Sequence, residues 1–141
     1  MSEALVFGSQ EAHVQYAERR AAYVVIINED GKVALVEGQQ NYFLPGGGAL
    51  PGEVPEETIA REVREELGRR VRLTRKIGAA TQYFYSAADE RHYQMRAVFF
   101  AGEFTDEPRV GACEHELLWL PLTEAEQVCF HACHAWAVRQ A

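Results

Sequence analysis

The stretch GGALPGEVPEETIAREVREELGR, residues 47 to 69, concentrates carboxylates on one side of a predicted helix. An α-helix turns by about 100° per residue. With Glu62 at zero, Glu66 falls at about 40° and Glu65 at about 300°, so the three carboxylates share one narrow face. Like charges spaced i,i+4 destabilise a helix by a few tenths of a kcal/mol. The pattern therefore indicates a cation that offsets the repulsion.

A solvated helix face is the ordinary explanation for a run of Glu and Arg. Ile59, Val63 and Leu67, however, follow i,i+4,i+8 spacing and predict the buried stripe of this helix. Glu62 and Glu66 border that stripe, so the acidic row lies where the helix meets the body of the protein. We therefore interpret the row as one half of a metal site.

The loop ahead of the helix, residues 45 to 52, is rich in Gly and Pro. Glycine adopts backbone conformations closed to other residues and allows a ligand to approach the backbone closely. Carboxylates and a loop carbonyl are the oxygen ligands that a hard divalent cation needs, and Mg²⁺ typically shares them with substrate phosphates. The loop is thus predicted to supply the other half of the site.

These residues resemble the Nudix box, which reads Gly, five residues, Glu, seven residues, then Arg-Glu-apolar-any-Glu-Glu-any-Gly-apolar. Gly47 opens the pattern, Glu53 follows, and residues 61 to 68 complete its charged and glycine positions. The chain departs from the pattern twice, with Arg69 at the final apolar position and Leu50 where an acid is often found. Neither departure touches a position expected to hold metal. A match with this many fixed positions is highly specific.

The resemblance implies an α/β (α+β) fold, a Nudix-like α/β/α sandwich with a mixed β-sheet, formed by one domain over residues 1–141. It implies Mg²⁺ as the cofactor, with Mn²⁺ as a substitute. The metal ligands that it implies are Glu62, Glu65, Glu66 and the carbonyl of Gly46. Support of the loop and of the helix ends is expected from Gly47, Glu53 and Gly68.

Phosphoanhydride cleavage needs neutralised phosphate charge, an aligned water and a base. We expect Glu62, Arg61 and Glu65 to be catalytic, with Glu62 acting either as a metal ligand or as the base. Arg61 either orients a catalytic carboxylate through a bidentate pair or is a surface i,i+4 partner of Glu65; we favour the first. Glu53 is expected to brace the loop or the helix start, and a direct metal contact is the alternative.

Further candidate residues carry less specific signals. Many Nudix proteins recruit another acid after the box, and the acids available here are Glu103, Glu114 and Glu116, of which we favour the last two. The alternative is that each is an ordinary loop acid.

Candidate substrate contacts lie on the strands around the box. The arginines that could bind phosphates are Arg20, Arg91 and Arg96. The aromatic residues that could stack on a nucleobase are Tyr83, Phe84 and Tyr85. The competing interpretation is that the arginines are surface charges and that the aromatic strand is core on one side.

Composition fits one globular domain and narrows the functions. The 141 residues, 48% of them hydrophobic, can bury a working core. A formal net charge of -7 disfavours nucleic-acid binding. Three cysteines argue against a disulfide framework and suit the cytoplasm. We see no signal peptide and no apolar run long enough to span a membrane.

Local patterns predict one helix from Pro55 to Gly68 and a second from Glu124, capped by Thr123 with Glu126 as its capping-box partner. A hairpin through 29–31 is predicted to join strands at 21–28 and 33–37. Further strands are predicted at 42–44, 71–73, 77–85, 93–104 and 117–120. For the first 18 residues two interpretations stay open, an edge strand or a contact in a homodimer.

Cys129, Cys133 and His134 invite a zinc interpretation, but their spacing matches no common structural zinc motif. We expect the two cysteines to be buried on one face of an amphipathic helix, together with Val128, Ala132, Ala135 and Trp136.

The sequence thus predicts a cytoplasmic Mg²⁺-dependent Nudix hydrolase. Its substrate is expected to be a small nucleoside diphosphate linked to another moiety, cleaved at the diphosphate. One alternative is a dinucleoside polyphosphate hydrolase, since Glu114-His115 before a Trp-Leu-Pro stretch is similar to that branch. The other is a non-catalytic Nudix domain that binds nucleotides as a sensor, although such domains usually lose acids of the box.

Overall fold

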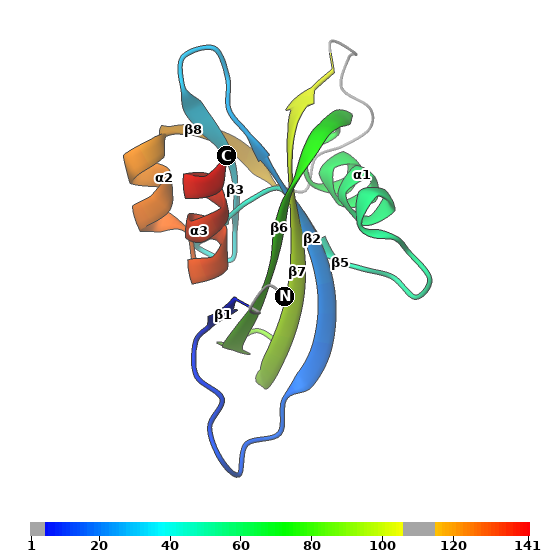
Figure 1. Ribbon diagram of the computed structural model, residues 1–141, viewed down its shortest axis with the longest axis vertical. Coiled ribbons are helices and arrows are strands. Elements are labelled where there is room, and N and C mark those ends of the chain that lie inside the picture. Colours follow the sequence, from blue (N-terminus) through cyan, green and yellow to red (C-terminus); the bar gives the residue numbers. More distant parts are fainter. Residues whose placement is uncertain (1–4, 106–114) are drawn as a thin grey trace.

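The computed structural model describes residues 5–105 and 115–141, which form two sheets and three helices (Figure 1). The strands are β1 (Val6–Phe7), β2 (Ala17–Ile26), β3 (Lys32–Gly38), β4 (Asn41–Phe43), β5 (Gly46–Gly48), β6 (Val71–Ser86), β7 (Arg91–Phe104) and β8 (Glu116–Pro121). The helices are α1 (Pro55–Leu67), α2 (Leu122–Val128) and α3 (Ala132–Gln140).

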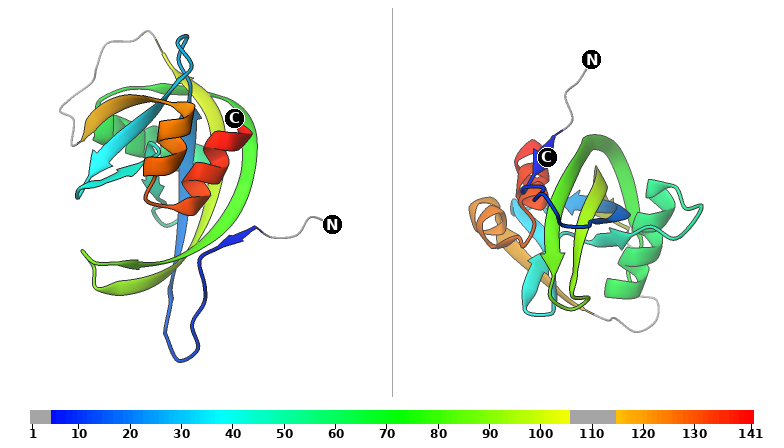
Figure 2. Two further views of the ribbon diagram at one scale, coloured as in Figure 1. Left: turned by 90° about the vertical axis from the view of Figure 1, so that its left-hand side faces the viewer. Right: turned by 90° about the horizontal axis from the view of Figure 1, so that it is seen from below.

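The larger sheet has the strand order β1-β6-β7-β2-β5 and the smaller sheet the order β4-β3-β8. The larger sheet is mixed, because β2 runs parallel to β7 and antiparallel to β5. Helix α1 lies on one side of the long strands, and α2 and α3 lie on the other (Figures 1 and 2). This confirms the predicted sandwich with a mixed sheet.

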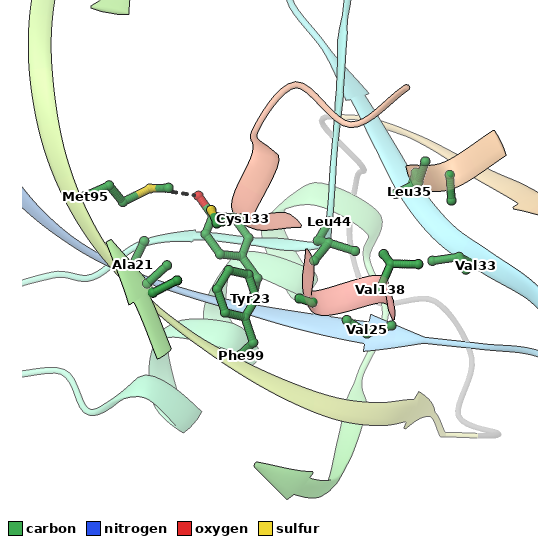
Figure 3. Close-up of a cluster of buried hydrophobic side chains, with 14 residues drawn as sticks. Ala21, Tyr23, Val25, Val33, Leu35, Leu44, Met95, Phe99, Cys133 and Val138 are labelled. Carbon is green, nitrogen blue, oxygen red and sulfur yellow. Dashed lines mark hydrogen bonds between the residues drawn. The ribbon is translucent and has the colours of Figure 1, made fainter. Parts of the chain in front are cut away.

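Strands β2 and β3 face two separate hydrophobic cores. Odd-numbered residues such as Tyr23 and Val25 pack with α2 and α3 (Figure 3). Even-numbered residues such as Ala22 and Val24 pack with Ile59 and the other buried residues of α1. Strands buried on both faces carry continuous apolar sequences, which is why residues 21–26 show no alternation.

Helix α1 forms where the local signals predict it. Pro55 occupies its first turn, and the Glu57 carboxylate accepts a hydrogen bond from the Val54 amide at 3.0 Å. Ile59 and Val63 are fully buried, as the spacing predicts. Gly68 ends the helix in the left-handed conformation, with φ 62°, which glycine adopts at little cost.

The turn predicted at 29–31 is present, but the prediction that it joins two paired strands of one sheet is wrong. The Asn28 amide donates to the Lys32 carbonyl at 2.9 Å, but only the bridge between Ile27 and Val33 extends the pairing. Beyond that bridge β2 and β3 diverge into different sheets. Residues 71–73 and 77–85 belong to one strand, β6, which is irregular between Leu73/Arg75 and Lys76/Gly78.

The capping role predicted for Thr123 is wrong. Helix α2 starts at Leu122, directly after Pro121, and its first turn has no side-chain cap. Strand β8 reaches Pro121, which has no N–H to continue the ladder, so the chain turns into the helix two residues earlier than predicted. The closing helix is also divided in two at residues 129–131.

The start of the described chain is an edge strand, one of the two alternatives. Val6 and Phe7 pair in parallel with Thr81 and Gln82 of β6. Within residues 5–105 and 115–141 no helix has the length and apolar character that a membrane span requires.

Candidate active site

A cavity of about 840 Å³ lies beside the glycine strand β5. One group of its lining residues is polar and comprises Arg19, Gly46, Gly47, Glu62 and Glu66. A second group is aromatic and comprises Phe43, Phe84, Phe130 and His131. A single cavity therefore joins carboxylates and an arginine to a cluster of rings.

Glu66 connects α1 to β5. Only 8% of this residue is exposed, and its Oε1 accepts a hydrogen bond from the Gly46 amide at 3.0 Å. Gly46 has φ +136°, and a Cβ there would overlap the carbonyl oxygen of Ala22. The strand thus lies against β2 at a distance that only glycine allows, which brings its backbone to the carboxylate.

Glu62 lies against the next glycine. A Cβ on Gly47 would come within 2.7 Å of Glu62 Oε2. Burial raises the pKa of Glu62, while its hydrogen bond to the Arg61 guanidinium opposes that rise. The carboxylate is therefore held at the backbone of β5 and partly out of water.

Arg61 joins the helix to the loop. It donates to both carboxylate oxygens of Glu53, at 2.7 and 3.0 Å, and to the Gly48 carbonyl at 2.8 Å. It also donates to Glu62 at 2.9 Å and to Glu65 at 3.2 Å. Both predicted contacts of Arg61 are thus present, but the bidentate pair is made with Glu53 rather than with an acid of the cavity.

Glu53 accepts further bonds from the Leu50 amide at 2.8 Å and from the Thr58 hydroxyl at 2.9 Å. The Arg61 guanidinium, followed by the Leu50 amide, lowers the pKa of Glu53 to about 2. Glu53 is absent from the cavity wall. These contacts fit a brace between the loop and the helix better than a metal ligand.

The donor chemistry of this site suits a hard divalent cation, because it consists of carboxylate oxygens beside a glycine backbone. Glu62 and Glu65 both turn toward the same nitrogen of Arg61, at 2.9 and 3.2 Å. In the described part of the chain no three His, Cys, Asp or Glu residues are grouped as metal ligands. Glu62 and Glu65 are thus engaged by Arg61 rather than grouped with Glu66.

The sequence-predicted substrate contacts lie away from the cavity, apart from Phe84 and Tyr85, which line it. Arg20 is exposed, and exposed Arg96 lies 3.4 Å from Glu18. Tyr83 packs edge-on against Tyr16 at 5.2 Å. Strand alternation turns the side chains of Arg20 and Arg96 to the face opposite Tyr23, and the structure brings none of these three residues to the cavity wall. Exposed Arg91 is also outside the wall.

The predicted additional acids do not join the site in the described residues. Glu116 is exposed on β8, opposite Glu37, and does not line the cavity. Glu103 pairs with Arg72. Glu114 lies outside the described residues.

Arg19 and His131 are among the cavity residues that the sequence prediction does not name. Arg19 has the same parity along β2 as the cavity residue Tyr23, and this parity is the signal that could have distinguished it from Arg20. His131 lies between two helices that the sequence predicted as one, so no local signal pointed to it.

The two cysteines do not share a helix, because Cys129 is the C-cap of α2 and Cys133 lies in α3. Both are free, and burial raises the pKa of each thiol to about 12. Val128 and Ala132 are exposed, contrary to the predicted packing face. The buried positions are Ala125, His131, Cys133, His134, Ala137 and Val138, and the partly buried Trp136 packs against the core as predicted.

Residues 17–139 match the family model described as the NUDIX domain. A candidate 8-oxo-dGTP diphosphatase of Bacillus subtilis is 36% identical over 52% of this chain and 49% of its own length. The ADP-ribose pyrophosphatase of Methanocaldococcus jannaschii is 28% identical over 74% of this chain and 63% of its own. The chain thus spans about half to two-thirds of the length of these relatives.

Solved structures share the fold. The crystal structure of a MutT NUDIX hydrolase from Burkholderia pseudomallei has a TM-score of 0.63 and 27% identity, over 89% of this chain and 98% of that chain.

Proposed function

The chain belongs to the Nudix family, and from this premise we propose that it is a Mg²⁺-dependent pyrophosphohydrolase. Its substrate is a nucleoside diphosphate linked to another moiety. Hydrolysis of the diphosphate bond releases a nucleoside monophosphate and a phosphorylated product. We place this activity in the cytoplasm, where its free cysteines stay reduced.

The observation that supports this proposal is the cavity, which offers different surfaces to the two halves of such a substrate. Glu62 and Glu66 line it beside Gly46 and Gly47, where the backbone is open to a close approach. Carboxylates beside a phosphate group need a divalent cation between them, because both carry negative charge. The polar group is therefore assigned to the diphosphate.

The aromatic group is assigned to the nucleobase. Phe84 lies 4.5 Å from His131, and Phe43 lies 5.6 Å from Phe130, between ring centroids. Phe130 is 44% exposed, so one of these rings is open to contact with a ligand. Every nucleobase has a π-face, so any base can stack favourably on an aromatic side chain.

Glu62, Glu65 and Glu66 would hold the cation, with the carbonyl of Gly46. Bound Mg²⁺ would neutralise the charge on the phosphate oxygens and lower the pKa of the attacking water. Arg61 keeps Glu62 and Glu65 close to each other, so these carboxylates need only rotate to meet a ligand. The alternative role that we propose for Glu62 is that of the base.

Two alternatives are tested together with this proposal. A dinucleoside polyphosphate hydrolase would cleave a longer phosphate chain at the same carboxylates. A nucleotide sensor would bind without turnover. The intact set of acids in α1 favours catalysis over sensing, since a sensor does not need them.

The test is a substrate panel of nucleoside triphosphates, nucleotide sugars, dinucleoside polyphosphates and coenzyme derivatives, assayed for released nucleoside monophosphate with Mg²⁺ or Mn²⁺. We expect turnover of a nucleotide linked through a diphosphate. Glu65→Gln and Glu66→Gln should lower turnover by orders of magnitude, while Glu56→Gln, on the exposed start of the same helix, should not. Near-normal rates in both variants would remove the metal assignment. Tight binding without turnover would favour the sensor.

A further inference from the structure

The guanidinium of Arg19 lines the cavity without a protein acceptor. Its Nε is buried and has no hydrogen-bond partner, and no ion pair joins Arg19 to a carboxylate within residues 5–105 and 115–141. A buried donor left without an acceptor destabilises the folded protein, and more so when it is charged. Such a group calls for an explanation, and an anion bound in the cavity supplies one.

Gly48 shows how closely the chain accommodates this side chain. A Cβ on Gly48 would lie 3.1 Å from both Nε and Nη2 of Arg19. On its other side, the carbonyl of Gly48 accepts a hydrogen bond from Arg61. The last residue of β5 therefore contacts two arginines, of which Arg61 is fully engaged by acceptors and Arg19 has no acceptor among the residues that the structure describes.

The Tyr93 ring supports the guanidinium from the β7 side. The Arg19 Cζ lies 5.8 Å from the ring centroid, a distance at which an arginine is attracted to an aromatic face. Tyr93 is itself fixed, because its hydroxyl donates to Asp89 at 2.7 Å and its ring stacks on Phe84 at 5.4 Å. The Arg19 guanidinium is thus positioned by aromatic rings and by Gly48 rather than by a carboxylate of the described residues.

The charge of Arg19 acts on residues of both groups that line the cavity. Burial lowers the pKa of His131 to about 4, and the positive charge of Arg19 adds to that effect. The same charge acts on Glu62, where it opposes the effect of burial on the pKa. If the base lies in the aromatic group and the diphosphate contacts a cation at Glu62, the diphosphate would therefore lie near the Arg19 guanidinium.

We infer that Arg19 binds the diphosphate of the substrate, a role that rests on the proposed function. A guanidinium fork matches the geometry of phosphate oxygens and donates to two of them at once. The neighbouring Arg20 shares the charge and the strand, but it is exposed and absent from the cavity wall. It is therefore a matched control.

The experiment measures binding of inorganic pyrophosphate to the full chain in the presence of Mg²⁺, by ³¹P NMR titration. Arg19→Gln should raise the dissociation constant by about 10- to 100-fold, the effect of losing hydrogen bonds to a charged group. Arg20→Gln should change it by less than about twofold. Arg19→Lys should recover part of the affinity, because it keeps the charge and loses the fork.

Equal affinity of wild type and Arg19→Gln would overturn the inference, and so would an absence of saturable binding by wild type. A purely structural role would lower the unfolding midpoint and leave the affinity of the folded fraction unchanged, which also overturns it. If the wild type hydrolyses nothing in the panel but binds pyrophosphate through Arg19, the proposed hydrolase fails and this inference stands. If it hydrolyses a substrate with the same KM in Arg19→Gln, the inference fails alone.

Discussion

Glu66 Oε1 accepts a hydrogen bond from the amide of Gly46 at 3.0 Å, which fastens the last turn of α1 to the glycine strand. The carboxylate is almost fully enclosed, so water cannot readily replace it as the acceptor. Glu66 therefore stabilises the position of β5 in addition to its proposed contact with a cation.

Glu66→Ala should destabilise the fold, whereas Glu66→Gln should preserve most of the stability. The alanine variant leaves the Gly46 amide without its acceptor and should lose about 1–3 kcal/mol of unfolding free energy. The glutamine variant retains an oxygen acceptor. Urea denaturation measures the unfolding free energy of both variants. If Glu66→Ala unfolds with the wild-type free energy, the Gly46 amide must find another acceptor.

Gly47→Ala should lower turnover with little loss of stability. The added methyl would lie within 2.7 Å of Glu62 Oε2 and would displace that carboxylate. Gly52→Ala is the opposite case, because nothing lies within 4 Å of its added Cβ while its φ is +81°. It should lose about 1–2 kcal/mol of stability and keep its turnover per folded molecule. A comparison of kcat with the thermal midpoint separates the two, and equal kcat in both glycine variants would refute the displacement of Glu62.

Arg61→Lys tests whether the fork of Arg61 matters beyond its charge. Lysine cannot donate to both oxygens of Glu53 and to Gly48 at once, so the loop and Glu62 should shift. A displacement of about 1 Å in such a site lowers turnover by up to about 100-fold. The exposed Arg64→Lys on the same helix is the control. Wild-type kcat for Arg61→Lys would instead support the surface pair with Glu65.

The stability should decrease on mild acidification because of two buried histidines. Burial lowers the pKa of His131 from 6.5 to about 4, and burial also lowers that of His134 well below 6.5. The folded state thus binds fewer protons than the unfolded chain in this interval, so the unfolding free energy falls as pH falls from about 6.5 toward 4. For His131 the loss reaches about 3 kcal/mol.

Urea midpoints at about pH 7.5 and pH 4.5 measure this loss. His131→Phe should reduce the difference between the two, and what remains should come largely from His134. Phe130→Leu, which removes no titratable group, should keep the wild-type difference. An unchanged difference in His131→Phe would assign the acid sensitivity to other groups.

The sequence predicted both ends of α1 to within about one residue because its signals are local. Pro55, the apolar stripe and Gly68 each act within a few residues. The division of the closing helix depends on distant contacts instead. The Phe130 amide donates to the Tyr42 carbonyl at 2.9 Å, and the Cys133 amide donates to Gln82 at 3.1 Å. No local pattern reports such partners.

The sequence analysis named Arg20 and not Arg19 for a related reason. The strand that follows them is buried on both faces, so its sequence does not show which neighbour points to the cavity. The acids of the site were identified because a helical wheel fixes their direction, whereas the direction of a strand residue depends on the register with β5 and β7.

Strand β5 has no side chains, so every neighbour contacts its backbone directly. A methyl group on Gly46, Gly47 or Gly48 would meet Ala22, Glu62 or Arg19 respectively. A substitution at any of these glycines would therefore displace the β2 backbone or a side chain of the site. We therefore expect differences in substrate range to arise from lining residues that carry side chains, on β4 and at the tip of the β6–β7 hairpin, where Asn41, Phe43 and residues 84–89 line the cavity.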